Sequence, residues 1–296
     1  MARYITPAVT PMNADGSIDE AGVRNLYDFL IQGGVDAILA LGSIGEFFAF
    51  TPEQKKQLIP LAVRAVDHRV RLIVGTGDMV IGNVIDLSNF ALAEGADAVI
   101  VVPPYYFWLN GNSIEEYFDT LAREIHGNLF IYNFPDRTGY QIPAEVIGRL
   151  ALRHGNIIGC KDTISGMDHT REIIKAVKPH RPEFEVYSGF DDNFAHNVLS
   201  GGDGCIGGLS NLAPEVCHAW TEAFARNDLA AVAEIQQKVD RLMSIYTVGM
   251  PFVPFIKRAM VLRGIGIQSF ASAPLPCSTE EQDQQLLAIM RQESLI

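Results

Sequence analysis

The chain has 296 residues, of which 48% are hydrophobic and 20% are charged, and its formal net charge is −12. This is an ordinary globular composition with enough apolar material for one large α/β domain or two smaller ones. The acidic balance, without any basic stripe, argues against a nucleic-acid-binding protein. No apolar run reaches the roughly 18 residues that a membrane span requires, so we expect no membrane partner.

The cysteines and the first residues indicate a cellular compartment. Cys160, Cys205, Cys217 and Cys277 lie far apart, and the first two fall in strand-like runs. This spacing predicts small buried thiols in a reducing cytosol, and neither a disulfide framework nor a zinc site. The N-terminal residues carry no apolar signal region before a small-residue cleavage site, so we expect a cytoplasmic protein.

Short apolar runs alternate along the chain with longer segments of helical period. The predicted strands are Tyr4–Val9, Asp36–Leu41, Arg71–Gly75, Asp97–Val102, Leu129–Asn133, Ile157–Lys161, Glu185–Ser188 and Gly204–Leu209. The predicted helices are Asp19–Gln32, Pro52–Asp67, Gly82–Ala93, Ser113–His126, Pro143–Arg153, Met167–Val177, Asn193–Leu199 and Pro214–Ala225. Strands that alternate with helices pair in parallel, and eight such units predict an α/β fold, a closed (β/α)8 TIM barrel over residues 1–226. A doubly wound open sheet is the alternative, but no G-x-G-x-x-G follows the first strand.

Three further helical patterns follow the eighth unit, at Leu229–Thr247, Phe252–Arg263 and Thr279–Gln292. No long polar linker separates them from the preceding residues. We therefore predict that residues 227–296 form a C-terminal helical extension packed on the barrel.

One lysine stands apart from the others. The run I-I-G-C-K-D-T at 157–163 places Lys161 near the end of a buried strand, whereas the remaining lysines fall in patterns typical of solvent-facing helices. Burial disfavours the ammonium form and leaves a neutral amine that can attack a carbonyl. The structural alternative is an ion pair between Lys161 and Asp162 or another carboxylate.

The C-terminal ends of the predicted strands carry further polar and aromatic residues, at the rim where such barrels place their reactive groups. These positions include Ser43, Ile44, Tyr105, Tyr106, Tyr132, Arg137, Thr163, Gly189, Asp191 and Asp192. The histidines fall mainly in helices or their flanks, so the rim lacks a set of metal ligands. An amine with nearby phenols suits imine chemistry, in which the amine attacks a ketone and a phenol moves protons.

Structural interpretations stand beside the catalytic ones. Tyr132 also fits a barrel-lining aromatic, Tyr105 and Tyr106 an interface patch, and Arg137 a helix cap or a bridge to Asp136.

The loops after the last two strands also have both a functional and a structural interpretation. Asp191 and Asp192 could bind substrate hydroxyls or cap the following helix. Gly207 and Gly208 could cradle a phosphate, but without a basic neighbour they favour close backbone packing.

Five segments resemble a known family when they are taken together and in order. They are G-S-I-G-E at 42–46, P-P-Y-Y at 103–106, Y-N-F-P at 132–135, G-C-K-D-T at 159–163 and G-G-D-G-C-I-G-G at 201–208. Over nearly its whole length the chain resembles the pyruvate-dependent class I aldolases of the dihydrodipicolinate synthase and N-acetylneuraminate lyase family. The resemblance implies that Lys161 is the Schiff-base lysine and that Tyr132 is the general acid/base.

The resemblance also implies partners and a carboxylate site. Ser43 would belong to a proton relay that Tyr106 of the partner subunit completes, so a dimer or a dimer of dimers is expected. The loop with Ser43 and Ile44 would bind the substrate carboxylate, and Ile206 would line the pyruvate pocket, with Gly189 also a substrate-binding residue. No metal or other cofactor is expected, because the imine forms on the lysine itself.

Departures from the family patterns indicate a branch. Ile44 replaces the usual second hydroxyl residue, so one side-chain hydrogen bond to the carboxylate is lost. Arg137, in P-D-R-T-G, resembles the arginine of the synthases, whereas Thr163 resembles lyases that hold polyhydroxylated substrates. Y-Y-F-W-L, G-F-D-D and P-F-V-P-F-I-K are closer to the 2-keto-3-deoxy-sugar-acid aldolases. Pro52 and Lys55 stand where the synthases often have the histidines of a lysine feedback site, which makes such feedback doubtful.

The sequence therefore predicts a class I aldolase that reversibly cleaves a 2-keto-3-deoxy sugar acid, such as 2-keto-3-deoxygluconate, to pyruvate and an aldehyde. A dihydrodipicolinate synthase, condensing pyruvate with aspartate semialdehyde, is the alternative that Arg137 favours. A non-catalytic paralogue that binds a 2-oxo acid is a third possibility, suggested by Ile44.

Overall fold

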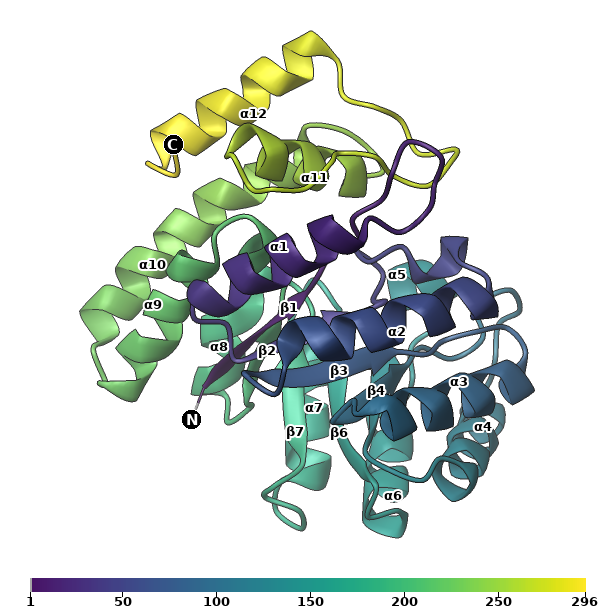
Figure 1. Ribbon diagram of the computed structural model, residues 1–296. Helices are drawn as coiled ribbons and strands as arrows, with labels where there is room; N and C mark the ends of the chain where they lie inside the picture. Colours follow the sequence, from purple (N-terminus) through teal and green to yellow (C-terminus); the bar gives the residue numbers. More distant parts are fainter. Residues whose placement is uncertain (1) are drawn as a thin grey trace.

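The computed structural model describes residues 2–296, in which eight parallel strands close into a barrel in sequence order (Figure 1). The strands are β1 (Arg3–Pro7), β2 (Ala37–Ala40), β3 (Arg71–Gly75), β4 (Ala98–Val101), β5 (Leu129–Asn133), β6 (Ile157–Asp162), β7 (Glu185–Ser188) and β8 (Gly204–Ile206). Pairing of β1 with both β2 and β8 completes the closure. The predicted (β/α)8 fold is confirmed.

The helices cover the outside of the barrel. They are α1 (Glu20–Gln32), α2 (Pro52–Val66), α3 (Ile81–Glu94), α4 (Gly111–Glu124), α5 (Pro135–Thr138), α6 (Ala144–Arg153), α7 (Asp168–Val177), α8 (Phe194–Leu199) and α9 (Pro214–Ala225). Short 3-10 turns, η1 (Phe47–Ala49), η2 (Asp191–Asn193) and η3 (Gly208–Asn211), follow β2, β7 and β8. Local signals set several starts: at α2, Thr51 and Gln54 form a capping box around Pro52. No described helix has the length and apolar character needed to cross a membrane.

The two ends of the barrel interior differ in chemistry. Near the N-terminal ends of the strands, Arg71 donates to both oxygens of Glu185 at 2.8 and 2.9 Å, and Tyr187 donates to the same carboxylate. Toward the other end, Tyr132 of β5 pairs in register with Lys161 of β6. Ion pairs therefore close the bottom of the barrel, whereas Tyr132 and Lys161 lie toward its C-terminal rim.

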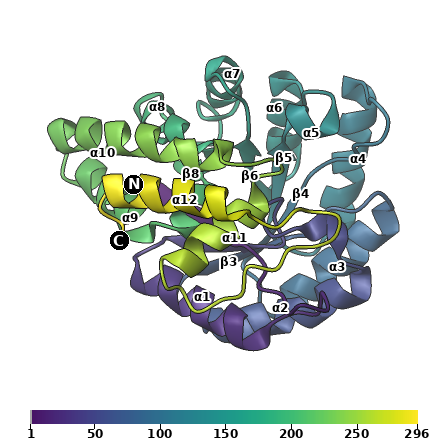
Figure 2. The same ribbon diagram turned by 90° about the horizontal axis from the view of Figure 1, so that it is seen from above.

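The C-terminal extension comprises α10 (Leu229–Leu242), η4 (Met243–Thr247), α11 (Val253–Leu262) and α12 (Glu280–Gln292). Figures 1 and 2 show these helices, coloured green to yellow, gathered on one side of the barrel, with α11 between α12 and the rest of the molecule. Fully buried residues of this segment, such as Leu242, Ile256 and Met260, belong to the same hydrophobic core as the barrel.

Several element boundaries differ from the sequence prediction. The last strand ends at Ile206, three residues early, because only Gly204–Ile206 pair with β7 and β1 before the chain turns into η3. The short helix α5 was not expected, and the predicted helix Leu229–Thr247 changes to a 3-10 turn after Leu242. Strand ends depend on available partners, which periodicity does not reveal.

Candidate active site

Lys161 lies on the inner side of the barrel and is 5% exposed. Its Nζ is 4.6 Å from the centre of the Tyr132 ring. Asp162 points away from it, because neighbouring residues of a strand face opposite sides, and accepts hydrogen bonds from Asn133 and Thr170 at 2.7 and 2.6 Å. Across residues 2–296 no carboxylate forms an ion pair with Lys161. The ion-pair interpretation is therefore wrong for this lysine.

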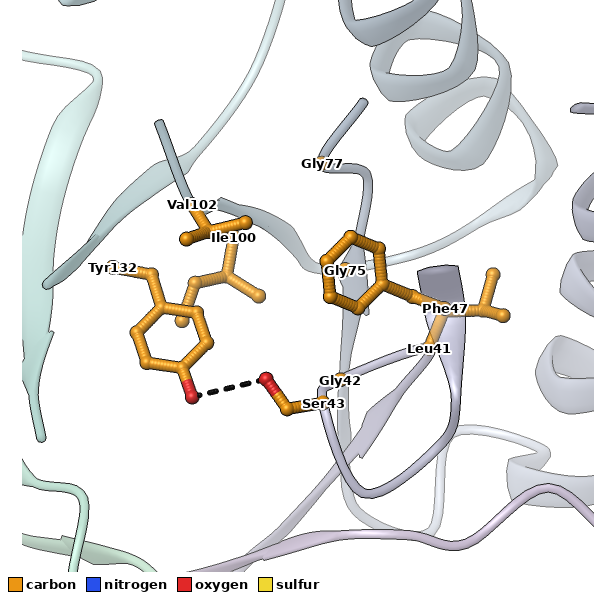
Figure 3. A pocket seen from close by; sticks show the side chains of 9 residues that line it. All are labelled: Leu41, Gly42, Ser43, Phe47, Gly75, Gly77, Ile100, Val102 and Tyr132. Carbon is orange, nitrogen blue, oxygen red and sulfur yellow. Dashed lines mark hydrogen bonds between the residues drawn. The ribbon is translucent and has the colours of Figure 1, made fainter. Parts of the chain in front are cut away.

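Tyr132 connects the amine to the loop after β2. Its hydroxyl lies 3.3 Å from Ser43 Oγ, and Figure 3 shows the two hydroxyls pointing toward each other. On its other side the ring stacks on Phe134, with 5.8 Å between the ring centres. A phenol with an amine at its ring and a hydroxyl on its oxygen has the contacts that proton transfer requires.

The loop after β2 presents backbone donors. In the described part of the chain, the N–H groups of Ser43 and Ile44 donate to no protein acceptor. The Ile44 side chain packs on Gly208, where an added Cβ would overlap its Cδ1. A Cβ on Gly207 would likewise overlap the carboxylate of Asp191, which confirms the close packing expected for the glycine pair. Ile206, fully buried in β8, lies directly before this pair.

Thr163 and Gly189 lie against each other beyond Lys161. A Cβ on Gly189 would overlap Thr163 Oγ1 and lie 2.5 Å from Thr163 Cβ. The Thr163 hydroxyl is buried and has no hydrogen-bond partner. Buried polar groups are nearly always paired, so this hydroxyl lacks a partner that a ligand could supply.

Two predicted site residues lie at the surface of the single chain. Tyr106 is 79% exposed and contacts Phe107 edge to face, with 5.0 Å between ring centres. Arg137 lies on α5 with its guanidinium 5.5 Å from the Phe134 ring centre, and no bridge to Asp136 is formed. Folding of one chain thus brings Ser43, Tyr132 and Lys161 together and leaves the other two apart.

A small hollow opens beside the Ser43–Tyr132 contact. It has an empty volume of about 210 Å³, and apolar residues, Phe47, Ile100 and Val102 among them, form most of its wall (Figure 3). Gly75 also lines it, and a Cβ there would overlap the carbonyl of Leu41. The site therefore has an apolar side next to its hydroxyl pair.

Asp191 has a different role from either one expected. It is buried, and its carboxylate accepts hydrogen bonds from the Leu209 amide and the Tyr246 hydroxyl, both at 2.9 Å, and from Tyr4. Burial raises the pKa of Asp191. Neither Asp191 nor Asp192 caps the following helix, so the capping interpretation is wrong. Asp191 ties β1, η3 and the C-terminal extension together.

The exposure expected for the other lysines is also wrong in two cases. Lys55 is 3% exposed and donates to the Gly77 carbonyl at 3.2 Å. Lys257 is fully buried, and its Nζ lies 2.5 Å from Glu46 Oε1. Both lysines lie on helices, and the sequence pattern predicts that they face solvent. In the structure each lies on the buried face of its helix and donates to a group that is distant in the sequence. Cys277 is exposed, unlike the other three cysteines.

In the part of the chain that the structure describes, no three His, Cys, Asp or Glu side chains group so that they could hold a metal ion. The rim does contain the Lys161 amine, which no carboxylate of the described residues neutralises. That feature is typical of barrel enzymes that form a lysine imine with a carbonyl substrate.

Comparison with known proteins places the chain in a family. The model of the dihydrodipicolinate synthetase family matches residues 1–293, and the chain belongs to this family. Its members use a lysine Schiff base and need no cofactor. The protein is therefore a class I aldolase or lyase.

Three relatives illustrate the similarity. The chain is 34% identical to the "Probable 2-dehydro-3-deoxy-D-pentonate aldolase YjhH" of Escherichia coli over 99% of this chain and 97% of the relative. It is 35% identical to the "Putative 2-dehydro-3-deoxy-D-gluconate aldolase YagE" of the same organism, over 98% and 96%. The crystal structure of YagE in complex with pyruvate superposes with a TM-score of 0.97 over 100% of this chain and 99% of that one. A 4-hydroxy-tetrahydrodipicolinate synthase of Kosmotoga olearia is 34% identical over 88% of each chain.

Proposed function

We propose that the protein reversibly cleaves a 2-keto-3-deoxy sugar acid, such as 2-keto-3-deoxygluconate, to pyruvate and an aldehyde through an imine on Lys161. The observation that carries this proposal is the buried Lys161 amine, which has no carboxylate partner among residues 2–296 and lies 4.6 Å from the Tyr132 ring centre. An amine that is not held in an ion pair is the nucleophile that imine formation with a ketone requires.

The chemistry follows from these positions. The Lys161 amine adds to the C2 carbonyl of the sugar acid, and loss of water leaves a protonated imine that can accept an electron pair. Tyr132, whose phenol proton has gone to the departing water, takes the proton of the C4 hydroxyl as the C3–C4 bond breaks, which releases the aldehyde and leaves an enamine. A proton returned to C3 gives the pyruvate imine, and water then frees pyruvate and the amine. Ser43, 3.3 Å from the phenol oxygen, serves as the next group of the relay.

Binding of the substrate is assigned to two places. The N–H groups of Ser43 and Ile44, which have no protein acceptor in the described chain, receive the carboxylate, so the apolar side chain of Ile44 does not prevent binding. The unpartnered hydroxyl of Thr163 receives a hydroxyl of the sugar-acid chain, with Gly189 leaving room beside it. Ile206, the last residue of β8, lines the pyruvate pocket in this proposal.

A second copy of the chain completes the relay in this proposal. Tyr106, Phe107 and Trp108 are 79%, 75% and 69% exposed and form an aromatic surface of the kind enriched at interfaces. In a dimer or a dimer of dimers, Tyr106 of the partner subunit reaches Ser43. The cytoplasm is the proposed compartment, since all four cysteines are free.

The alternative function is 4-hydroxy-tetrahydrodipicolinate synthase. It is favoured by Arg137, an exposed guanidinium on α5 with no ion-pair partner in the described residues, which could hold the carboxylate of aspartate semialdehyde. Incubation with pyruvate and either glyceraldehyde or aspartate semialdehyde separates the two functions. Condensation with the semialdehyde alone would refute the sugar-acid proposal.

Borohydride reduction in the presence of pyruvate, followed by peptide mass spectrometry, tests the imine directly. We expect one reduced adduct, on Lys161, and none in Lys161→Ala. The two other buried lysines, Lys55 and Lys257, are internal controls that should stay unmodified. An adduct spread over surface lysines, or no adduct at all, would favour the non-catalytic paralogue. Retro-aldol turnover that disappears in Lys161→Ala would exclude that paralogue.

A further inference from the structure

A fully buried ion pair ties the C-terminal extension to the loop after β2. Glu46 ends the G-S-I-G-E segment, and its Oε1 lies 2.5 Å from Lys257 Nζ on α11, both side chains being 0% exposed. Its other oxygen, Oε2, accepts hydrogen bonds from the amide and hydroxyl of Ser272 at 2.7 and 2.6 Å. Lys257 also donates to the Phe270 carbonyl at 2.8 Å. Apart from the bond within the pair, each side-chain hydrogen bond that these two residues make in the described chain joins them to the extension.

The backbone of the loop needs such support. Leu41 and Glu46 have φ values of 54° and 57°, and they lie on either side of the segment that carries Ser43 and Ile44. Non-glycine residues adopt this left-handed conformation at a cost, and it persists where surrounding contacts hold it. At Glu46 the three side-chain hydrogen bonds to the extension supply those contacts.

A second contact of the extension reaches the glycine turn against which Ile44 packs. Tyr246, in η4 of the extension, donates to Asp191 at 2.9 Å. A Cβ on Gly208 would lie 2.7 Å from the Tyr246 hydroxyl and would also overlap Ile44 Cδ1. The extension therefore contacts both the loop that carries Ile44 and the glycine turn on which Ile44 packs.

The other ion pairs of the extension differ in place and exposure. Arg258, the neighbour of Lys257 on α11, pairs with Asp283 of α12 at 2.6 Å, with side chains 30% and 17% exposed. That pair joins two helices of the extension and does not touch the loop. A buried ion pair contributes little net stability compared with apolar packing, but in some proteins it specifies one geometry. The location of the Glu46–Lys257 pair suggests that the selected geometry is that of the loop.

We propose that Glu46 and Lys257 are positioning residues of the active site. Their pair holds the loop so that the N–H groups of Ser43 and Ile44 face the carboxylate of the bound 2-oxo acid. The C-terminal extension then helps to set the geometry of the active site. This inference rests on the proposed function, because it takes the loop as the carboxylate-binding element.

The test uses the double variant Glu46→Gln/Lys257→Met, which removes both charges and leaves neither one buried alone. Imine formation on Lys161 is measured by borohydride trapping over a range of pyruvate concentrations. We expect the half-maximal concentration to rise about tenfold or more, since a displacement of about 1 Å can cost about 10²-fold. The matched control, Arg258→Met/Asp283→Asn, loses an ion pair one residue away and should stay within about twofold of the unmodified protein.

Folding of each variant is checked by circular dichroism and by the oligomeric state. If the double variant does not fold, Ser272→Ala removes only the 2.6 Å bond to Glu46 and should give a smaller shift in the same direction. The positioning role would be overturned if the half-maximal pyruvate concentration stayed unchanged in a folded double variant or in Ser272→Ala. An equal shift of that concentration in the control variant would overturn it as well. Absence of any Lys161 adduct in the unmodified protein would refute the proposed function instead, so the two failures are distinguishable.

Discussion

Replacing His169 by glutamine removes one partner of a buried pair directly behind Lys161. His169, on α7, is 3% exposed, and its Nδ1 lies 3.1 Å from both carboxylate oxygens of Asp162. Its Nε2 lies 2.9 Å from the carbonyl oxygen of Ile142. Because both ring nitrogens face acceptors, we predict that both carry a hydrogen and that the side chain is an imidazolium. Glutamine cannot supply two donors at opposite ends.

The cost of the substitution follows from what Asp162 retains. Asn133 and Thr170 still donate to the carboxylate, which stays 1% exposed. Losing a hydrogen bond to a charged group costs about 1.5–3 kcal/mol, and breaking a buried ion pair about 3–5 kcal/mol. With two donors left, we expect a loss of about 2–3 kcal/mol and a fall of several degrees in the melting temperature. Turnover should also fall, because Asn133 and Asp162 pair in register one residue beyond Tyr132 and Lys161.

A surface histidine of the same chain provides the control. His154 contacts Asp119 at 2.8 Å, but the two side chains are 14% and 21% exposed. Pairs near the surface contribute about 0–1 kcal/mol, so His154→Gln should change the melting temperature little. Equal losses in the two variants, or a singly protonated His169 in nitrogen-15 NMR spectra near neutral pH, would refute the reasoning.

The pair also predicts a pH dependence. Burial by itself lowers the pKa of His169, but Asp162, with the Ile142 carbonyl and Glu172 of the same helix, outweighs it and raises the pKa above its usual value. A raised folded-state pKa means that the stabilisation is complete below the unfolded value of about 6.5 and is lost as the pH rises through the folded value. Melting temperatures from about pH 6 to pH 9 should therefore decline in the unmodified protein, and this decline should be smaller in His169→Gln.

Three further outcomes test the site itself. Tyr132→Phe should lower turnover by about 10²–10⁴-fold if the phenol moves the proton, and a loss under about threefold would remove that role. Gly189→Ala forces its Cβ against Thr163 Oγ1, so kcat/KM for the sugar acid should fall at least about tenfold, whereas an unchanged value would place the substrate elsewhere. Mixing Lys161→Ala chains with Tyr106→Phe chains should restore activity in hybrid dimers, because one site per dimer then has both groups; inactive hybrids would argue against a shared relay.

Much of the fold could be predicted because it rests on local patterns. Alternation of apolar runs and helical segments identifies the eight strand–helix units, since the side-chain periods of strands and helices are properties of neighbouring residues. The same alternation places Lys161 near the end of a buried strand, and the structure then shows it in register with Tyr132. The barrel then requires that residues at the ends of different strands share one rim, which is how Ser43 could be assigned to the site in advance.

Contacts between residues that are distant in the sequence could not be predicted from local patterns. Glu46 and Lys257 are 211 positions apart, and both look like ordinary surface charges until α11 folds against the loop. Asp191 resembles a helix cap in sequence, but Tyr4 and Tyr246, from opposite ends of the chain, bury its carboxylate.

The sequence by itself thus determined the barrel, and it predicted which residues lie at its C-terminal rim and that one lysine lies on a buried strand. Only the tertiary structure decided which buried charges are neutralised. Periodicity depends on neighbours along the chain, whereas the free energy of a buried charge depends on the groups that folding brings within a few ångströms of it.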